Sequence, residues 1–218
     1  MVRGVTVSAD KTAFQVERIA FFSDAVFAIA ITLMIIEVKP PHLHGAYHEQ
    51  LMQLAALTPM FIGVALSFAL IGVFWYRHHQ LFRSITNYTT GFIVRNLVVL
   101  GTIIFIPFST AFNFENGLDH GNVAIVFYCL NYFAASLANL ILFRYALDPA
   151  NGVSDGDVGI DHRSLFSELE FPLIVFVFAI VLSFIHPQLA PIGFALFAMQ
   201  GMYTKFRSPK PRLASEAR

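Results

Sequence analysis

Apolar segments long enough to cross a lipid bilayer follow one another along almost the whole chain. A helix that spans about 30 Å of hydrocarbon needs about 20 mostly apolar residues. Six segments fit this length, at residues 19–38, 54–76, 91–113, 121–146, 170–186 and 189–206. Of the 218 residues, 56% are apolar and only 13% are charged, about half the charged fraction of an average soluble domain. The sequence therefore predicts an all-α integral membrane protein with six transmembrane helices.

Prolines and polar stretches divide these spans. Pro187 and Pro191 separate the last two spans, which are short, and proline interrupts helical hydrogen bonding. These two spans are predicted to form a tight hairpin, and Pro107 is expected to bend the third span. The polar residues 148–170 are expected to form a solvated linker. One membrane domain is predicted for residues 1–206, followed by a basic tail at 207–218.

Basic residues are distributed unevenly between the two sides of the predicted membrane. If the N-terminus is inside, 13 of the 14 Lys and Arg residues are cytoplasmic and only Lys39 is outside. Positively charged loops near helix ends stay in the cytoplasm, so both termini are predicted to be cytoplasmic. The basic tail can contact anionic lipid headgroups, although most such tails act only as topology signals. A net formal charge of zero argues against nucleic acid as a partner.

Signatures of common enzyme classes are missing from the sequence. It contains no Walker loop, G-x-S-x-G, H-E-x-x-H or dinucleotide-binding fingerprint. We therefore expect no enzyme activity, no catalytic residues, no metal site and no cofactor. His42, His44 and His48 lie in the predicted outer loop, where they are either ordinary polar residues, a pH sensor or ligands for a transition metal.

The first span has a branched apolar stripe and a polar pair that do not share a face. At 100° per residue, the stripe covers roughly 100° of the helix. It consists of Phe22, Ile29, Thr32, Leu33 and Ile36. Ser23 and Asp24 lie roughly 120° and 140° from Ile29, in opposite directions. The polar pair therefore faces away from the stripe.

Asp24 needs a partner from another helix, because an ionised carboxylate in hydrocarbon is costly unless it is hydrogen-bonded or neutralised. Arg18 lies about 120° round the same helix, too far for a salt bridge within it. Candidate partners at the inner ends of the second and third spans are Trp75, Arg77, His78, Arg95 and Asn96. We interpret Ser23 and Asp24 as an anchor that turns the Ile29 stripe away from its own bundle. Two simpler interpretations stay open: Asp24 snorkels to the interface, and the stripe contacts lipid.

Residues 18–24 read R-x-x-x-F-S-D, with Arg18, Phe22, Ser23 and Asp24 at the specified positions. This motif and the following AVFAIAITLM resemble the first helix of the transmembrane protein 175 family, the lysosomal and bacterial potassium channels. The similarity is strongest over residues 17–41, with weaker support at 74–82 and 95–112. The six-span length resembles the prokaryotic members.

The resemblance implies a homotetramer, in which the first helix of each subunit lines a central pore in a bacterial inner membrane. It implies passive potassium conduction through a constriction of apolar side chains, with no carbonyl selectivity filter. The family's principal constriction falls on Ile29, with Thr32 one turn outward and Leu33 and Ile36 farther along the pore. Met34 replaces a more usual leucine, and its flexibility and similar volume predict little change. Membrane lipids and permeant monovalent cations are the implied partners.

Other functions remain compatible with the same bundle. A proton-permeable leak is one, because His78, His79 and Asp24 offer groups for a proton relay. A small-solute transporter is another, although internal repeats and interrupted polar helices are not evident. A membrane enzyme or scaffold is the third, and the missing catalytic and metal-binding patterns argue against it.

Overall fold

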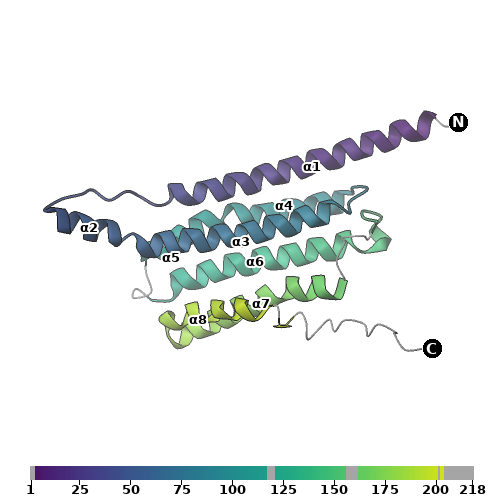
Figure 1. Ribbon diagram of the computed structural model, residues 1–218. Coiled ribbons are helices and arrows are strands. Elements are labelled where there is room, and N and C mark those ends of the chain that lie inside the picture. Colours follow the sequence, from purple (N-terminus) through teal and green to yellow (C-terminus); the bar gives the residue numbers. More distant parts are fainter. Residues whose placement is uncertain (1–2, 117–120, 156–161, 201, 204–218) are drawn as a thin grey trace, which may run out of the picture.

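The chain folds into a helical bundle whose long helices run alongside one another (Figure 1). The computed structural model describes residues 3–116, 121–155, 162–200 and 202–203. In these residues the helices are α1 (Arg3–Ile36), α2 (Tyr47–Ala55), α3 (Thr58–Phe82), α4 (Thr90–Ile104), α5 (Ile106–Asn116), α6 (Val123–Ala146), α7 (His162–Ile185) and α8 (Ala190–Ala195). Short 3-10 turns lie at Pro149–Asn151, Pro187–Leu189 and Leu196–Met199. The all-helical class predicted from the sequence is confirmed.

Five helical segments among the described residues are long and apolar enough to cross a membrane. They are Lys11–Ile36, Tyr47–Phe82, Thr90–Asn116, Val123–Ala146 and His162–Ile185, and they correspond to the first five predicted spans. The predicted sixth span, 189–206, contains α8 and a 3-10 turn as far as Met199. Residues 201 and 204–206 and the expected tail at 207–218 lie outside the described residues. The sixth span therefore stays a prediction.

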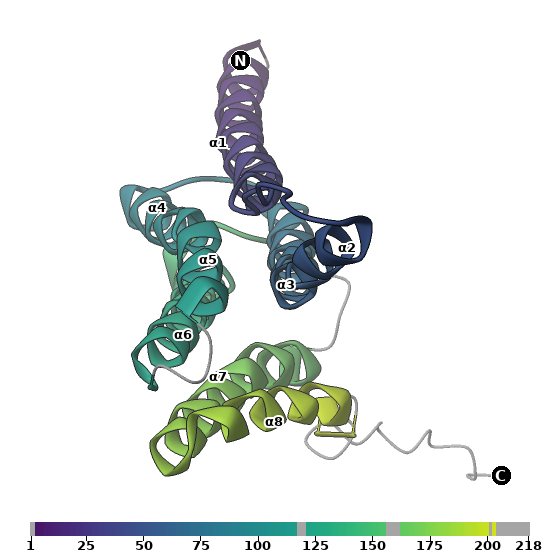
Figure 2. The same cartoon turned by 90° about the vertical axis from the view of Figure 1, so that its left-hand side faces the viewer.

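Helix α1 lies on one side of the bundle, where it packs on α3, α4 and α5 (Figure 2). Helix α6 is central, because it packs against α4 and α5 on one side and α7 on the other. Of the apolar 18-residue stretch of α1 that could span a membrane, only 22% is buried inside the subunit. The corresponding share for α6 is 56%. Most of the apolar surface of α1 is therefore left for contacts outside the subunit.

The helix of the third span is interrupted close to the proline at which the sequence predicts a bend. Helix α4 ends at Ile104 and α5 begins at Ile106, so the break falls at Phe105, two residues before Pro107. Proline has no backbone N–H and its ring crowds the preceding turn, which interrupts the hydrogen-bond ladder at this point. At the other end of α4, the Thr89 hydroxyl accepts a hydrogen bond from the Phe92 N–H at 3.2 Å and caps the helix.

Helix α7 begins earlier than the sequence suggests. The prediction of a solvated linker through residue 170 is wrong for its last part, because α7 starts at His162. Leu165 and Leu169 are buried and lie four residues apart, so this polar stretch has an apolar face that packs on the bundle. Residues 148–155 do form the expected connection between α6 and α7.

Helices α7 and α8 form the predicted hairpin, joined by the turn Pro187–Leu189 and packed against each other. Gly193 of α8 permits their close approach. A Cβ added at Gly193 would lie 2.9 Å from the Cβ of Ala179 and 3.0 Å from its Cα. The first distance is shorter than real Cβ contacts show and the second is at that limit, so the close approach of the two backbones depends on a glycine here.

Replacing Gly193 with alanine is expected to destabilise the hairpin. The new methyl group would push α8 away from α7, and overpacking of this kind costs about 1–3 kcal/mol. Gly72→Ala is the matched control, because a Cβ at Gly72 has no atom within 4 Å. Since alanine favours helix over glycine by about 1 kcal/mol, the control should keep or raise stability. Thermal unfolding of both variants in detergent tests this, and equal melting temperatures would contradict it.

Candidate functional site

Helix α1 presents one face to its own subunit. Ser23, Phe27, Ala30 and Met34 are all almost fully buried. Their spacing of four, three and four residues places them on one side of a helix with 3.6 residues per turn. This buried face is the one that contacts α3, α4 and α5.

The opposite face of α1 carries the apolar stripe. Ile29 is 56% exposed, and Phe22, Leu33 and Ile36 are exposed as well. The Thr32 hydroxyl is also exposed and donates a hydrogen bond to the Ile29 carbonyl at 2.9 Å. Its hydrogen is therefore used within the helix, and its two lone pairs are left free to accept. The stripe lies outside the subunit, with one oxygen ligand at its edge.

A buried hydrogen-bond chain joins α1 to α3 and α4 through Ser23. The Asn96 side-chain amide donates to the Ser23 hydroxyl at 2.9 Å, and Ser23 donates to the Ile19 carbonyl at 2.9 Å. The other end of Asn96, its amide oxygen, lies 2.8 Å from Nε2 of His78. Because this oxygen can only accept, His78 is the donor. All three side chains are at most 1% exposed, so the chain is shielded from water and lipid.

Asp24 has a different partner on α3. Nε1 of Trp75 donates to Oδ1 of Asp24 at 2.9 Å. The Trp75 ring stacks on His79, with centroids 5.7 Å apart and an interplanar angle of 27°. The carboxylate is therefore held by a neutral indole N–H that is itself fixed in orientation.

The three arginines considered near Asp24 contact other groups. Arg77 forms an ion pair with Glu168 of α7 at 3.3 Å. Arg95 donates to the Gly91 carbonyl at 2.9 Å and lies 4.0 Å over the ring of Tyr145, and Arg18 donates to Gln15 on the surface at 3.3 Å. The structure thus brings Ser23 and Asp24 together with Trp75, His78 and Asn96, and not with the arginines.

Glu168 is the ion-pair partner of Arg77, and the sequence shows no sign of this contact. It lies in the part of α7 that was predicted as linker, so no pattern connected it with Arg77. Just beyond the C-terminal end of α1 there is another unpredicted contact, in which Lys39 pairs with Glu115 of α5 at 3.2 Å. This pair is well exposed, and exposed pairs contribute little stability.

Comparisons with known proteins show that the segment containing this site is similar to a known family. Residues 18–107 match the family described as endosomal/lysosomal potassium channel TMEM175. The chain is 35% identical over 126 residues to a protein of Streptomyces collinus named as a potassium channel, a match that covers 56% of this chain and 59% of that protein. It is 29% identical over 140 residues to a Gallus gallus protein named endosomal/lysosomal proton channel TMEM175, which covers 60% of this chain and 28% of that protein. The chain thus spans less than two thirds of both relatives.

A solved structure agrees over a longer stretch. The crystal structure of a lysosomal potassium-selective channel TMEM175 homolog from Chamaesiphon minutus superposes with a TM-score of 0.70 at 27% identity. The superposition covers 90% of this chain and 99% of that one. The matched segment 18–107 contains the stripe on α1, the Ser23 and Asp24 pair and their partners on α3 and α4. Over residues 18–107 the chain therefore resembles the TMEM175 family, and its fold matches that of a channel of this family.

Proposed function

We propose that this protein is a potassium channel whose pore is lined by α1 from each of four subunits. The observation that carries the proposal is the uncovered stripe around Ile29 on a helix whose opposite face is fixed to its own bundle. A stripe of this kind can close around a symmetry axis and form a ring. The relatives named as potassium channels support potassium as the permeant ion.

The hydrogen bonds to Ser23 and Asp24 fix the orientation of α1 about its own axis. Bonds from Asn96 and Trp75 reach the helix from two neighbouring helices. Turning α1 about its axis would break both bonds and leave polar groups unpaired in hydrocarbon, where each such group is costly. The motif residues therefore act on the pore indirectly, by aiming the stripe.

Ion selection in this pore follows from dehydration. A ring of Ile29 side chains offers an ion nothing in place of its hydration water, so the narrowest state dewets and blocks. A slightly wider ring favours the cation that gives up water more cheaply, which is potassium rather than sodium. Thr32, one turn outward, presents lone pairs that replace part of the lost water, and Leu33 and Ile36 continue the apolar wall.

The remaining membrane arrangement completes the proposal. We infer six spans in a domain at 1–206, a basic tail at 207–218, cytoplasmic termini and a bacterial inner membrane. Supporting this orientation, the end of α3 and the start of α4 carry Arg83 and Arg95, while the end of α6 and the start of α7 carry Arg144 and Arg163. In an up-and-down bundle these four helix ends lie on the same side (Figure 1).

A proton-permeable channel is the second candidate function. The vertebrate relative named as a proton channel supports it, and His78 and Asp24 lie in one polar region at the inner end of the bundle. A small-solute transporter has no comparable support, and no bound cofactor is needed for either kind of conduction.

Substitution of the stripe is expected to change ion preference. Ile29→Asn hydrates the ring, so the permeability ratio of potassium to sodium should fall about tenfold, equivalent to ~1.4 kcal/mol. Thr32→Ala removes the oxygen ligand and should lower the ratio in the same direction. Reversal potentials in planar bilayers measure both effects.

Ile35→Asn is the matched control for these variants, because Ile35 is 55% exposed on the same helix but lies roughly 120° from Ile29. It should leave the ratio unchanged. Unchanged selectivity in both Ile29→Asn and Thr32→Ala would remove these residues from the filter.

Loss of the Asp24 bond is expected to weaken the subunit. Trp75→Phe keeps an aromatic ring but removes the donor to the Asp24 carboxylate, and a hydrogen bond to a charged group contributes about 1.5–3 kcal/mol. Tyr76→Phe, at the exposed neighbouring residue, should change stability by less than about 0.5 kcal/mol. Thermal unfolding and size-exclusion chromatography in detergent report stability and assembly. Equal melting temperatures for the two variants would argue against the anchor.

A further inference from the structure

The C-terminal end of α1 carries a carboxylate immediately beyond the apolar stripe. Glu37 follows Ile36, which is both the last residue of α1 and the last residue of the stripe. The N–H of Val38 donates to the carbonyl of Ile35 at 3.2 Å, so the chain completes a helical turn around Glu37 before it leaves the helix. Residues 40 and 41 are both proline, which cannot extend a helix. Glu37 therefore lies at the end of α1 that, in the proposed orientation, faces the outside.

Helical geometry places Glu37 beside the stripe. With 100° per residue, it lies about 40° round the helix from Leu33 and about 80° from Ile29. The rise of about 1.5 Å per residue puts it about 12 Å along the helix axis from Ile29. If four copies of the stripe form a ring, Glu37 lies at the rim of the outer opening and not in the narrowest part.

Glu37 has no partner that neutralises it within the subunit. Its side chain is partly buried, yet it makes no hydrogen bond or ion pair with any described residue. The nearby Lys39 is paired with Glu115, and Glu49 accepts a hydrogen bond from the Ala46 N–H at 2.8 Å at the start of α2. Among the charged side chains described at this end of the subunit, Glu37 is the one left without a partner.

We propose that the Glu37 carboxylates form a ring at the outer opening of the pore, where they attract potassium and other monovalent cations. This inference rests on the proposed tetramer with α1 at its centre. One carboxylate from each subunit gives a single opening a ring of negative charge, and rings of acidic side chains attract cations in other channels. Fixed charges around an opening with low-dielectric walls raise the local concentration of the opposite ion by about tenfold or more.

The ring acts on the number of ions that reach the pore and not on the choice between them. Potassium and sodium carry the same charge, so carboxylates at a wide opening attract both. The choice is left to Thr32 and Ile29, which lie about 7–12 Å farther along α1. Removing the ring should therefore lower the current and leave the permeability ratio of potassium to sodium unchanged.

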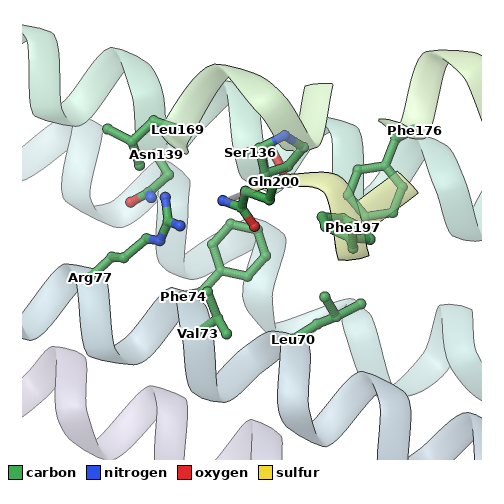
Figure 3. A pocket seen from close by; sticks show the side chains of 11 residues that line it. Leu70, Val73, Phe74, Arg77, Ser136, Asn139, Leu169, Phe176, Phe197 and Gln200 are labelled. Carbon is green, nitrogen blue, oxygen red and sulfur yellow. The ribbon is translucent and has the colours of Figure 1, made fainter. Parts of the chain in front are cut away.

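The interior cavity of the subunit does not compete for these cations. It lies between α3, α6, α7 and the segment that ends at Gln200, with a volume of about 80 Å³. Figure 3 shows Arg77 at one end of the cavity and the rings of Phe176 and Phe197 at the other. Glu168, the ion-pair partner of Arg77, is not among the described residues that line it. A guanidinium at the wall of so small a space repels a cation.

Removal of the charge tests the ring in planar bilayers that contain the full-length protein. Glu37→Gln keeps the shape of the side chain and breaks no contact, so the variant should fold and assemble. In about 20 mM potassium, its single-channel current for ions entering from the outer side should fall at least about twofold. In about 1 M potassium, where the Debye length is about 3 Å, the difference should shrink below about 1.2-fold.

Glu49→Gln is the matched control. It removes the same charge on the same side, and the glutamine oxygen can still accept from the Ala46 N–H. Glu49 lies on α2, which leads into α3 and not along the stripe (Figure 1). Its current should stay within about 1.2-fold of wild type at both potassium concentrations. An equal loss of current in both variants would overturn the ring, because it would show a general effect of surface charge.

Chemical restoration of the charge gives a second test. Cys129 is the only cysteine of the chain and is buried, so Glu37→Cys adds a single accessible thiol. A sulfonatoethyl methanethiosulfonate attaches a negative group to this thiol, and the trimethylammonioethyl reagent attaches a positive one. Added on one side, each reagent modifies only channels whose outer end faces it. The negative group should raise the current toward that of wild type and the positive group should lower it, while wild-type protein should respond to neither.

The outcomes separate the ring from the proposed pore. Current changes in the same direction with both reagents would overturn the ring, because they would show a steric effect. If Ile29→Asn alters the permeability ratio while Glu37→Gln leaves the current unchanged in dilute potassium, the pore stands and the ring is overturned. If neither substitution has an effect, α1 does not line the pore and both proposals fail.

Discussion

The hydrogen bonds that reach Ser23 and Asp24 are the contacts on which the proposed pore depends. Helices in lipid gain no hydrophobic driving force from packing together, because the lipid tails are as apolar as the side chains. Helix α1 is apolar on nearly every face, so hydrophobicity alone cannot choose which face turns inward. The bonds from Asn96 and Trp75 make that choice. The exposed position of Ile29 is a consequence of where two polar residues are held.

Polar groups in this subunit are sorted into two interior regions. One joins α1 to α3 and α4 through Ser23, Asn96 and His78, and every member of it has a partner. The other lies between α6 and α5, and within the described residues it contains the buried amide oxygens of Asn113 and Asn139, which have no hydrogen bond. Fully paired networks rigidify a structure, while unpaired oxygens call for water. The first region thus suits positioning, and the second suits hydration.

Hydropathy and proline positions were sufficient to predict the five long apolar helices, the bend near Pro107 and the hairpin between α7 and α8. The partner of Asp24 was harder to predict, because several residues on neighbouring helices lie at the same depth in the membrane. Depth alone does not say which of them makes the contact. Charge favours Arg77, yet Arg77 binds Glu168 and the neutral indole of Trp75 holds the carboxylate. The Arg77–Glu168 pair could not be predicted because the start of α7 was not recognised. The first turns of α7 are polar, and their apolar face is recognisable only where it packs on the neighbouring helices.

The buried polar side chains of α6 show a similar limit to what sequence alone can predict. Residues 128, 132, 136 and 139 lie at helical spacing and are visible in the sequence, but Ser67 and Thr110 join them from helices far apart along the chain. Only packing reveals that the Ser67 hydroxyl lies within 3.2 Å of the hydroxyls of both Thr110 and Tyr128.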